Sequence, residues 1–392
     1  MSKRRSRVTF TTRGSSLIAA GIATGVGAVV LGETDLLRIA VAVVVLCVLC
    51  WVYLKLSGLR LHTRHLAVPD EAPVGAPVVV QVPLRIQRRL LMVDLIAEDA
   101  TSDGLTAAPR LGVDPVGAAE GLTVRYTTAA HHRGLHLAGG TTATMQDPFG
   151  IAEIRVRSTD QVAILGLPHT ARVDRSWLRA LSAQDGLERA GNITALAEPD
   201  VDVRDHRAED GLRRVHWRTS ARVGRLMVRP DEPVEDRADV IVLDTREEAH
   251  FGHSFETLIE LAASLARAMT DSGGTVELRT WDGERIGERT FSDSSAVLRA
   301  LALLEPSTGA EYVGGSTAPT LLITTESAPR TALPRAHRGS SPLAIVLTHR
   351  DQVTASLRER ELELREHGIA TVHHSAREPV GHLLAHPPAA AR

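Results

Sequence analysis

The residues whose types and spacing most clearly suggest a binding site lie in an arginine-rich block, residues 204–229. The block holds eight arginines against three acidic residues, a net charge of +5 in a chain whose net charge is −2. Guanidinium groups bind carboxylates and phosphates through paired hydrogen bonds. We expect the block either to pair with its own acidic residues and join neighbouring domains, or to bind a phosphate or an acidic partner. Nucleic acid is disfavoured, because Trp217 is the only aromatic residue here and no nucleic-acid-binding motif accompanies it.

Other residues that could bind metals are expected to be structural. His132 and His136 would share one face of a strand with His131 beside them, but no acidic residue or cysteine lies at a spacing that would complete a metal site. Cys47 and Cys50 lie inside a hydrophobic segment and are expected to be small buried side chains. With only two cysteines there is no disulfide framework and no thiolate zinc site, which fits a reducing compartment.

Motifs of the common enzyme classes are missing from the sequence. It contains no Gly-x-Ser-x-Gly, no Gly-x4-Gly-Lys, no His-Glu-x-x-His and no Gly-x-Gly-x-x-Gly. We therefore expect a protein that is not an enzyme.

Two apolar runs near the N-terminus are long enough to cross a membrane. Residues 14–32 carry no formal charge and a second run covers 39–54, close to the roughly twenty residues needed to span about 30 Å of hydrocarbon. Basic residues flank both runs, whereas the short connection is acidic. The positive-inside rule predicts a transmembrane hairpin at 14–56, a basic cytoplasmic N-terminus at 1–13, and both ends in the cytoplasm. The alternative is a cleaved signal peptide that uses only the first run.

Residues 60–165 are predicted to form a small all-β sandwich. Apolar and polar residues alternate from 78 to 86, the period of a half-buried strand. Turn-forming residues separate the strands, as in Asp147-Pro148-Phe149-Gly150. Short strands at this spacing are typical of an antiparallel sandwich. Further strands are expected at 92–97, 122–127, 135–137, 151–156 and 161–165.

From residue 237 strand and helix patterns alternate. The apolar run 240–243 is typical of a strand buried in a parallel sheet. Helical spacing follows from Phe255 to Met269, with Ser254 as the expected N-cap. The alternation predicts a doubly wound α/β domain over 237–376, followed by a Pro/Ala-rich tail at 377–392. Its other strands are expected at 276–280, 321–324, 343–348 and 369–372, and its other helices at 295–304 and 352–367.

The segment 166–236, which contains the arginine-rich block, resembles the signature of the domain of unknown function 58 family. These are bacterial membrane proteins associated with MoxR-type AAA+ ATPases. Arg133-Gly134 and the Asp147–Gly150 turn resemble the same family's "RG … DPFG" segment, and two N-terminal membrane helices are its usual layout. Ala208-Glu209 departs from an expected Pro-Gly-like pair. The residues that carry the signature are Arg207, Asp210, Arg213, Arg214, His216, Trp217, Arg222, Gly224, Arg225 and Arg229.

The resemblance implies that the α/β domain is von Willebrand factor A-like. Such domains place Asp-x-Ser-x-Ser after the first strand, where the carboxylate and hydroxyls support a divalent cation. Asp244 stands at the first position, but Arg246 and Glu248 replace the serines, and hard cations need oxygen ligands. Asp244 is therefore only a weak candidate ligand, and we expect it to bond the backbone or an arginine instead, with no metal or other cofactor.

Together with the residues, the resemblance implies a membrane-anchored cytoplasmic scaffold or adaptor that acts with a MoxR-type AAA+ ATPase. The protein would be a multi-pass protein of the plasma membrane that contacts the lipid bilayer through its hairpin and binds no nucleic acid. The arginine-rich block would engage acidic partner groups or organise the joint between domains. The alternative is a metal-dependent von Willebrand factor A-type ligand-binding receptor.

Overall fold

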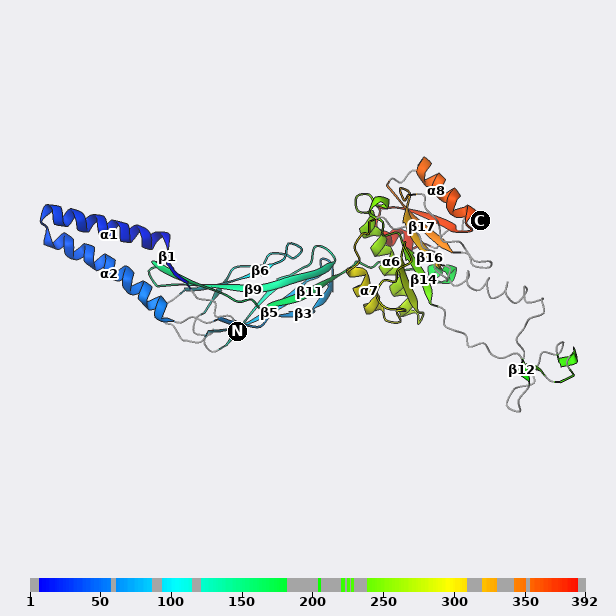
Figure 1. Ribbon diagram of the computed structural model, residues 1–392, viewed down its shortest axis with the longest axis horizontal. Helices are drawn as coiled ribbons and strands as arrows, with labels where there is room; N and C mark the ends of the chain where they lie inside the picture. The colour runs from blue at the N-terminus through cyan, green and yellow to red at the C-terminus, as the bar shows by residue number, and fades with distance from the viewer. Residues whose placement is uncertain are drawn as a thin grey trace. The chain divides into compact units, whose positions relative to one another are not determined.

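The chain forms two compact units, Met1–Leu167 and Pro168–Arg392 (Figure 1). Each unit contains its own sheets, so the first unit and the α/β unit are described separately. The computed structural model describes residues 7–57, 61–86, 94–114, 121–181, 204–205, 220–222, 224–225, 227–228, 238–308, 319–329, 342–349 and 353–386.

Two apolar helices near the start of the first unit pack side by side as a hairpin (Figure 1). Helix α1 spans Thr12–Leu31 and α2 spans Thr34–Ser57. The Thr11 side chain accepts a hydrogen bond from the Gly14 amide at the start of α1, and α1 ends at Gly32, whose φ of 71° places it in the left-handed region. Both helices are long and apolar enough to cross a membrane, by length and composition.

Two sheets that share one hydrophobic core make up the rest of the first unit. Alternate residues of β5, such as Val80 and Val82, point into this core and meet Met145 and Ile164 from the other sheet. The four-stranded sheet contains β2 (Leu61–Thr63), β3 (Leu66–Val68), β5 (Val78–Ile86) and β8 (Leu122–Thr128). The seven-stranded sheet contains β1 (Arg7–Phe10), β4 (Glu71–Pro73), β6 (Asp94–Thr101), β7 (Leu111–Val113), β9 (Gly134–Gln146), β10 (Ala152–Arg157) and β11 (Gln161–Leu167).

The sandwich differs from the predicted one in three respects. Strand β1 lies within the segment expected to be only a basic N-terminus, and it pairs with β10. Strands β11 and β4 are parallel, so the sandwich is not purely antiparallel. The run expected at 135–137 is the start of the 13-residue β9, because Gly139 and Gly140 carry the strand through a bulge opposite β6 instead of ending it.

The α/β unit is built on a five-stranded parallel sheet with the order β15-β14-β16-β17-β18. Val240 and Val242 pack with Leu357 and Leu364 of α8, while α6 also contacts β14 and β16. The first strand of this sheet, β14, lies inside it, and later strands are added on both sides of β14. This strand order is that of a doubly wound α/β fold. The strands are β14 (Asp239–Leu243), β15 (Val276–Thr280), β16 (Leu321–Thr325), β17 (Leu343–Thr348) and β18 (Ala370–Ser375), and the helices are α6 (Ser254–Asp271), α7 (Ser294–Ala302), α8 (Ala355–Glu366) and α9 (Val380–Leu384).

Two local features of this unit depart from expectation. The N-cap of α6 is His253, and Ser254 is the first helical residue, with its hydroxyl accepting from the Phe251 amide at 2.9 Å. Helix α9 lies within the segment expected as a tail. There the Trp177 indole donates to the Leu383 and His386 carbonyls, so the chain is packed up to this point.

Candidate functional site at the carboxyl edge of the parallel sheet

The strand order of the α/β unit reverses between β14 and β16. In doubly wound folds, ligands bind in the crevice outside the carboxyl ends of the strands at such a switch point. Asp244 directly follows β14, and Glu326 directly follows β16. This edge is therefore where a fold of this type would place a functional site.

Asp244 is completely buried at this edge, with 0% of its surface exposed. Its Oδ1 accepts from Arg246 Nε and its Oδ2 from Arg246 Nη2, each at 2.8 Å. Thr324, on the adjacent strand β16, donates its hydroxyl proton to Oδ2 at 2.7 Å. Both carboxylate oxygens are thus engaged by side chains of the same unit, as expected for an aspartate bonded to an arginine.

The guanidinium of Arg246 is enclosed as well, with 1% of the residue exposed. Its central carbon lies 4.3 Å from the centroid of the Trp281 ring, and that of Arg360, on α8, lies 5.8 Å from the same ring. Arg360 donates to Glu363 at 2.9 Å and to Thr324 at 3.4 Å. Cation–π attraction stabilises a desolvated guanidinium more than an exposed one. Two buried guanidinium groups thus lie near one aromatic ring at this edge of the sheet.

Polar groups around this ion pair bind the neighbouring loops. Glu326 accepts from the His349 amide at 2.7 Å and from the Thr354 hydroxyl at the N-terminus of α8. The His250 ring contacts the Asp244 carbonyl through Nε2 at 2.6 Å. Burial and the charge of Arg246 lower the pKa of His250, although its contacts with Asp244 oppose this. The ring therefore acts as a hydrogen-bonding group in a packed edge.

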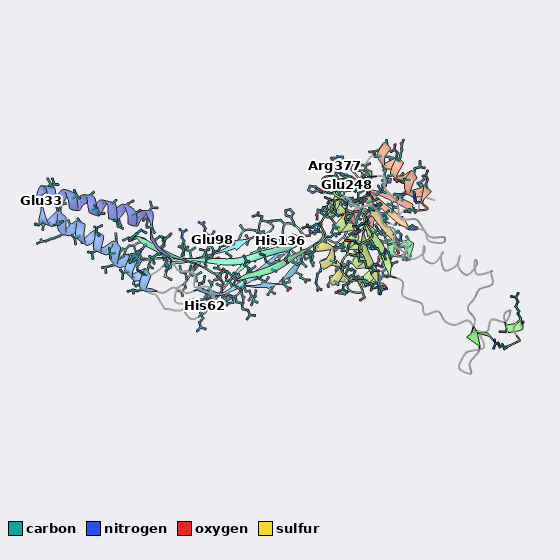
Figure 2. The ribbon with its side chains drawn as sticks, in the orientation of Figure 1. Glu33, His62, Glu98, His136, Glu248 and Arg377 are labelled. Atoms are coloured by element: carbon teal, nitrogen blue, oxygen red, sulfur yellow. The ribbon has the colours of Figure 1, made fainter. Side chains whose placement is uncertain are left out.

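The donor set does not fit a divalent cation. Mg²⁺ and Ca²⁺ require several free oxygen ligands, whereas the Asp244 oxygens face a guanidinium. Within the part of the chain that the structure describes, no group of three or more His, Cys, Asp or Glu side chains could hold a metal. Glu248, at the other position where a serine would be needed, is exposed (Figure 2).

The arginine-rich block is described at only a few positions. Strand β12 (Arg204–Asp205) pairs antiparallel with β13 (Met227–Val228), which brings the two ends of the block together. Arg222 and Arg225 are exposed, and Gly224 has a φ of 74° that suits glycine. The other signature residues lie outside the described residues: Arg207, Asp210, Arg213, Arg214, His216, Trp217 and Arg229.

Sequence reasoning missed a buried cluster around His65 in the first unit. His65 Nδ1 lies 2.9 Å from Asp160 Oδ2, and Nε2 lies 3.2 Å from Asp99 Oδ2. The Thr141 hydroxyl donates to Asp99 Oδ1 at 2.5 Å. Burial opposes protonation of the ring, but the hydrogen bonds and charges of the two carboxylates outweigh it and raise the pKa of His65. His65 thereby connects the loop after β2 to the seven-stranded sheet.

No local spacing could have identified this cluster, because the partners are far apart in the sequence. The histidines considered instead have other surroundings. His136 is buried, and its Nε2 lies 2.7 Å from the His132 carbonyl. Figure 2 labels His136 among the strands of the first unit. This contact fits the packing role expected for it.

Known proteins add no family assignment. The chain matches no protein-family model, and no curated protein matches it. The resemblance to the domain of unknown function 58 family therefore rests on the arginine-rich block, the Asp147–Gly150 turn and the two apolar helices.

Proposed function

We propose that this protein is a membrane-anchored scaffold or adaptor that binds other proteins at the cytoplasmic face. The observation that supports this best is the ion pair between Arg246 and Asp244, which fills the crevice where a doubly wound domain would otherwise bind a small ligand or metal. Protein binding by the outer surface of the α/β unit needs no such crevice. The unit would be a von Willebrand factor A-like domain that has lost its metal site.

The membrane anchor is the hairpin of α1 and α2. Both helices are long and apolar enough to span a membrane. Basic residues flank the hairpin, whereas Glu33 and Asp35 lie at the connection between its helices. The positive-inside rule then puts the connection outside and both the sandwich and the α/β unit in the cytoplasm. A multi-pass anchor of this kind would position the two units where a soluble ATPase reaches them.

The partner proposed from the family resemblance is a MoxR-type AAA+ ATPase. The arginine-rich block would bind acidic groups of that partner, because guanidinium forks match carboxylates in geometry and charge. The exposure of Arg222 and Arg225 supports a surface role for this block.

Copurification from native membranes tests the proposal. The full chain should recover the ATPase, and the charge-reversed variant Arg213→Glu/Arg214→Glu should recover several-fold less. The matched control is Arg358→Glu/Arg365→Glu, which makes the same charge change at two exposed positions of α8 and should recover as much as wild type. Equal recovery by all three proteins would refute the arginine surface, and no recovery by wild type would refute the adaptor function.

A further inference from the structure

The turn between β9 and β10 is fixed to the base of the hairpin. The Thr11 amide donates to the Ile151 carbonyl at 2.9 Å, and the Thr11 hydroxyl donates to the Gly150 carbonyl at 2.6 Å. Ile151 is also buried against Cys47 and Cys50 of α2. A methyl group at Gly14 would lie 2.1 Å from the Ile151 carbonyl oxygen, so helix and turn are in direct backbone contact.

The contacts of the turn define its depth along the hairpin. Helix α2 has 24 residues, about 36 Å at 1.5 Å per residue, and thus exceeds a hydrocarbon core of about 30 Å by little more than one turn. Cys50 lies seven residues before the end of α2, about 10 Å from it. Since Ile151 packs against Cys47 and Cys50, the turn lies about one to two helical turns inside the level where α2 leaves the hydrocarbon.

Phe149 lies at the tip of this turn and is 61% exposed. The buried carboxylate of Asp147 accepts from the Phe149 amide at 2.8 Å and from the Ala152 amide at 2.5 Å. The Gly150 amide donates to the Asp147 carbonyl at 2.9 Å. These bonds hold the turn in one shape while leaving the ring outside the core. Exposing a large apolar side chain to water in this way costs free energy that a lipid surface would recover.

Other side chains at the same level have the character of a membrane interface. Trp51 lies in the last two turns of α2, and Lys55 Nζ is 4.4 Å from the centroid of its ring. Phe10, on β1, is partly exposed directly opposite Ala152. Aromatic rings and basic side chains are enriched where a protein crosses the headgroup region. Phe149 extends this belt from the helices onto the sandwich.

We propose that the Asp147–Gly150 turn is a second membrane contact of the first unit, with Phe149 inserted among the lipid headgroups and upper acyl chains. The partner is the bilayer surface itself. This inference rests on the proposed function, because it requires the hairpin to span the membrane. It assigns the turn a role beside that of the helices, a direct contact between the sandwich and the lipid surface.

Photocrosslinking to lipid tests this in the full chain. Benzoylphenylalanine would replace Phe149, Leu135 or Ile22, one position at a time, in protein reconstituted into vesicles of phosphatidylethanolamine and phosphatidylglycerol. Leu135 is a matched control, because it is also 61% exposed but lies at the opposite end of β9, about 37 Å from Gln146 at 3.4 Å per residue. Ile22, 58% exposed near the middle of α1, reports on the hairpin.

We expect phospholipid adducts at positions 22 and 149, detected by mass spectrometry, several-fold above the yield at position 135. A yield at 149 no higher than at 135, with efficient crosslinking at 22, would overturn the proposed contact and leave the anchor standing. Absence of adducts at 22 would overturn the anchor and the contact together.

Discussion

Arg246 donates from two nitrogens to the two oxygens of Asp244, at 2.8 Å each, inside the α/β unit. The residues are two positions apart in the sequence, so both members of the pair come from the loop that leaves β14. A geometry of this kind is bidentate and charge-assisted, which makes it one of the stronger side-chain pairings available to a protein. It occupies the place where other domains of this architecture admit a ligand.

Breaking this pair from one side should be costly. Asp244→Asn removes the negative charge that faces the buried guanidinium of Arg246, which should destabilise the unit by about 3–5 kcal/mol. The free energy of opening, from hydrogen exchange of the β14 and β16 amides in the full chain, measures this. Asp244→Leu/Arg246→Met removes both charges and should cost clearly less, because the pair is replaced as a whole by apolar side chains. Equal losses in both variants would show that the pair has no special electrostatic role.

The same geometry predicts that the protein does not bind divalent cations at this edge. Titration calorimetry of the full chain with Mg²⁺ or Ca²⁺ should give no saturable heat at millimolar concentration, since the Asp244 oxygens are engaged by Arg246 and Thr324. A saturable heat that Thr324→Val abolishes would contradict this and would favour the metal-dependent receptor. Thr324→Val suits the comparison because it preserves the ion pair while removing a hydroxyl ligand.

Close packing at the base of the hairpin predicts a position-specific effect of one methyl group. Gly14→Ala would place a Cβ 2.1 Å from the Ile151 carbonyl oxygen. The resulting displacement should cost about 1–3 kcal/mol and weaken amide protection in β1 and β10. The control is Gly27→Ala in the same helix, where nothing lies within 4 Å of the added Cβ. Loss of protection in both variants, or in neither, would be inconsistent with this contact.

The cluster of His65, Asp99 and Asp160 predicts a pH dependence of the first unit. The pKa of His65 is raised in the folded state, so its stabilising effect is complete below the ordinary pKa near 6.5 and is lost as pH rises through the raised value. Amide protection of β6 and β9, corrected for intrinsic exchange, should therefore fall on the alkaline side. His65→Gln should abolish this dependence.

The control for this dependence is His62→Gln, because His62 is exposed on β2 three residues earlier (Figure 2). It should retain the wild-type pH profile. Asp99 predicts a loss of stability on the acid side of the pH profile. Although burial opposes its ionisation, hydrogen bonds from His65 and Thr141 lower its pKa. Its stabilising effect is present above an ordinary pKa near 3.8 and is lost as pH falls through the lowered value. If the amide protection of β6 and β9 in wild type did not fall between neutral pH and pH 9, the role assigned to His65 would be contradicted.

Elements whose patterns are local could be predicted from the sequence. The apolar runs became α1 and α2, and β17 has the predicted bounds, because a strand buried on both faces is apolar along most of its length. Strand β15 also has the predicted bounds, and its apolar and charged residues alternate. The extent of β9 could not be predicted in this way, because Gly139 and Gly140 are typical turn residues but lie within the strand. Glycine permits both conformations, and only the pairing with β6 decides between them.

In the candidate site, too, contacts between near neighbours in the sequence could be predicted and contacts between distant segments could not. The bond between Asp244 and an arginine could be anticipated, because Arg246 is a near neighbour in the sequence. The enclosure of that arginine by Trp281 and Arg360 could not, since these come from distant segments that the parallel sheet brings to one edge. His65 was missed for the same reason: its partners Asp99 and Asp160 depend on the packing of two sheets, which no periodicity encodes.

The proposed function depends most on the hairpin holding the sandwich and the α/β unit at the cytoplasmic face, and cysteine labelling tests this directly. Glu33→Cys lies at the connection between α1 and α2 (Figure 2), and Leu362→Cys is exposed on α8 of the other unit. The parent chain, whose cysteines lie in α2, supplies the baseline. With a membrane-impermeant maleimide, position 33 should react in intact cells and position 362 only after the membrane is disrupted. Reaction of position 362 in intact cells, or of position 33 only after disruption, would contradict the account.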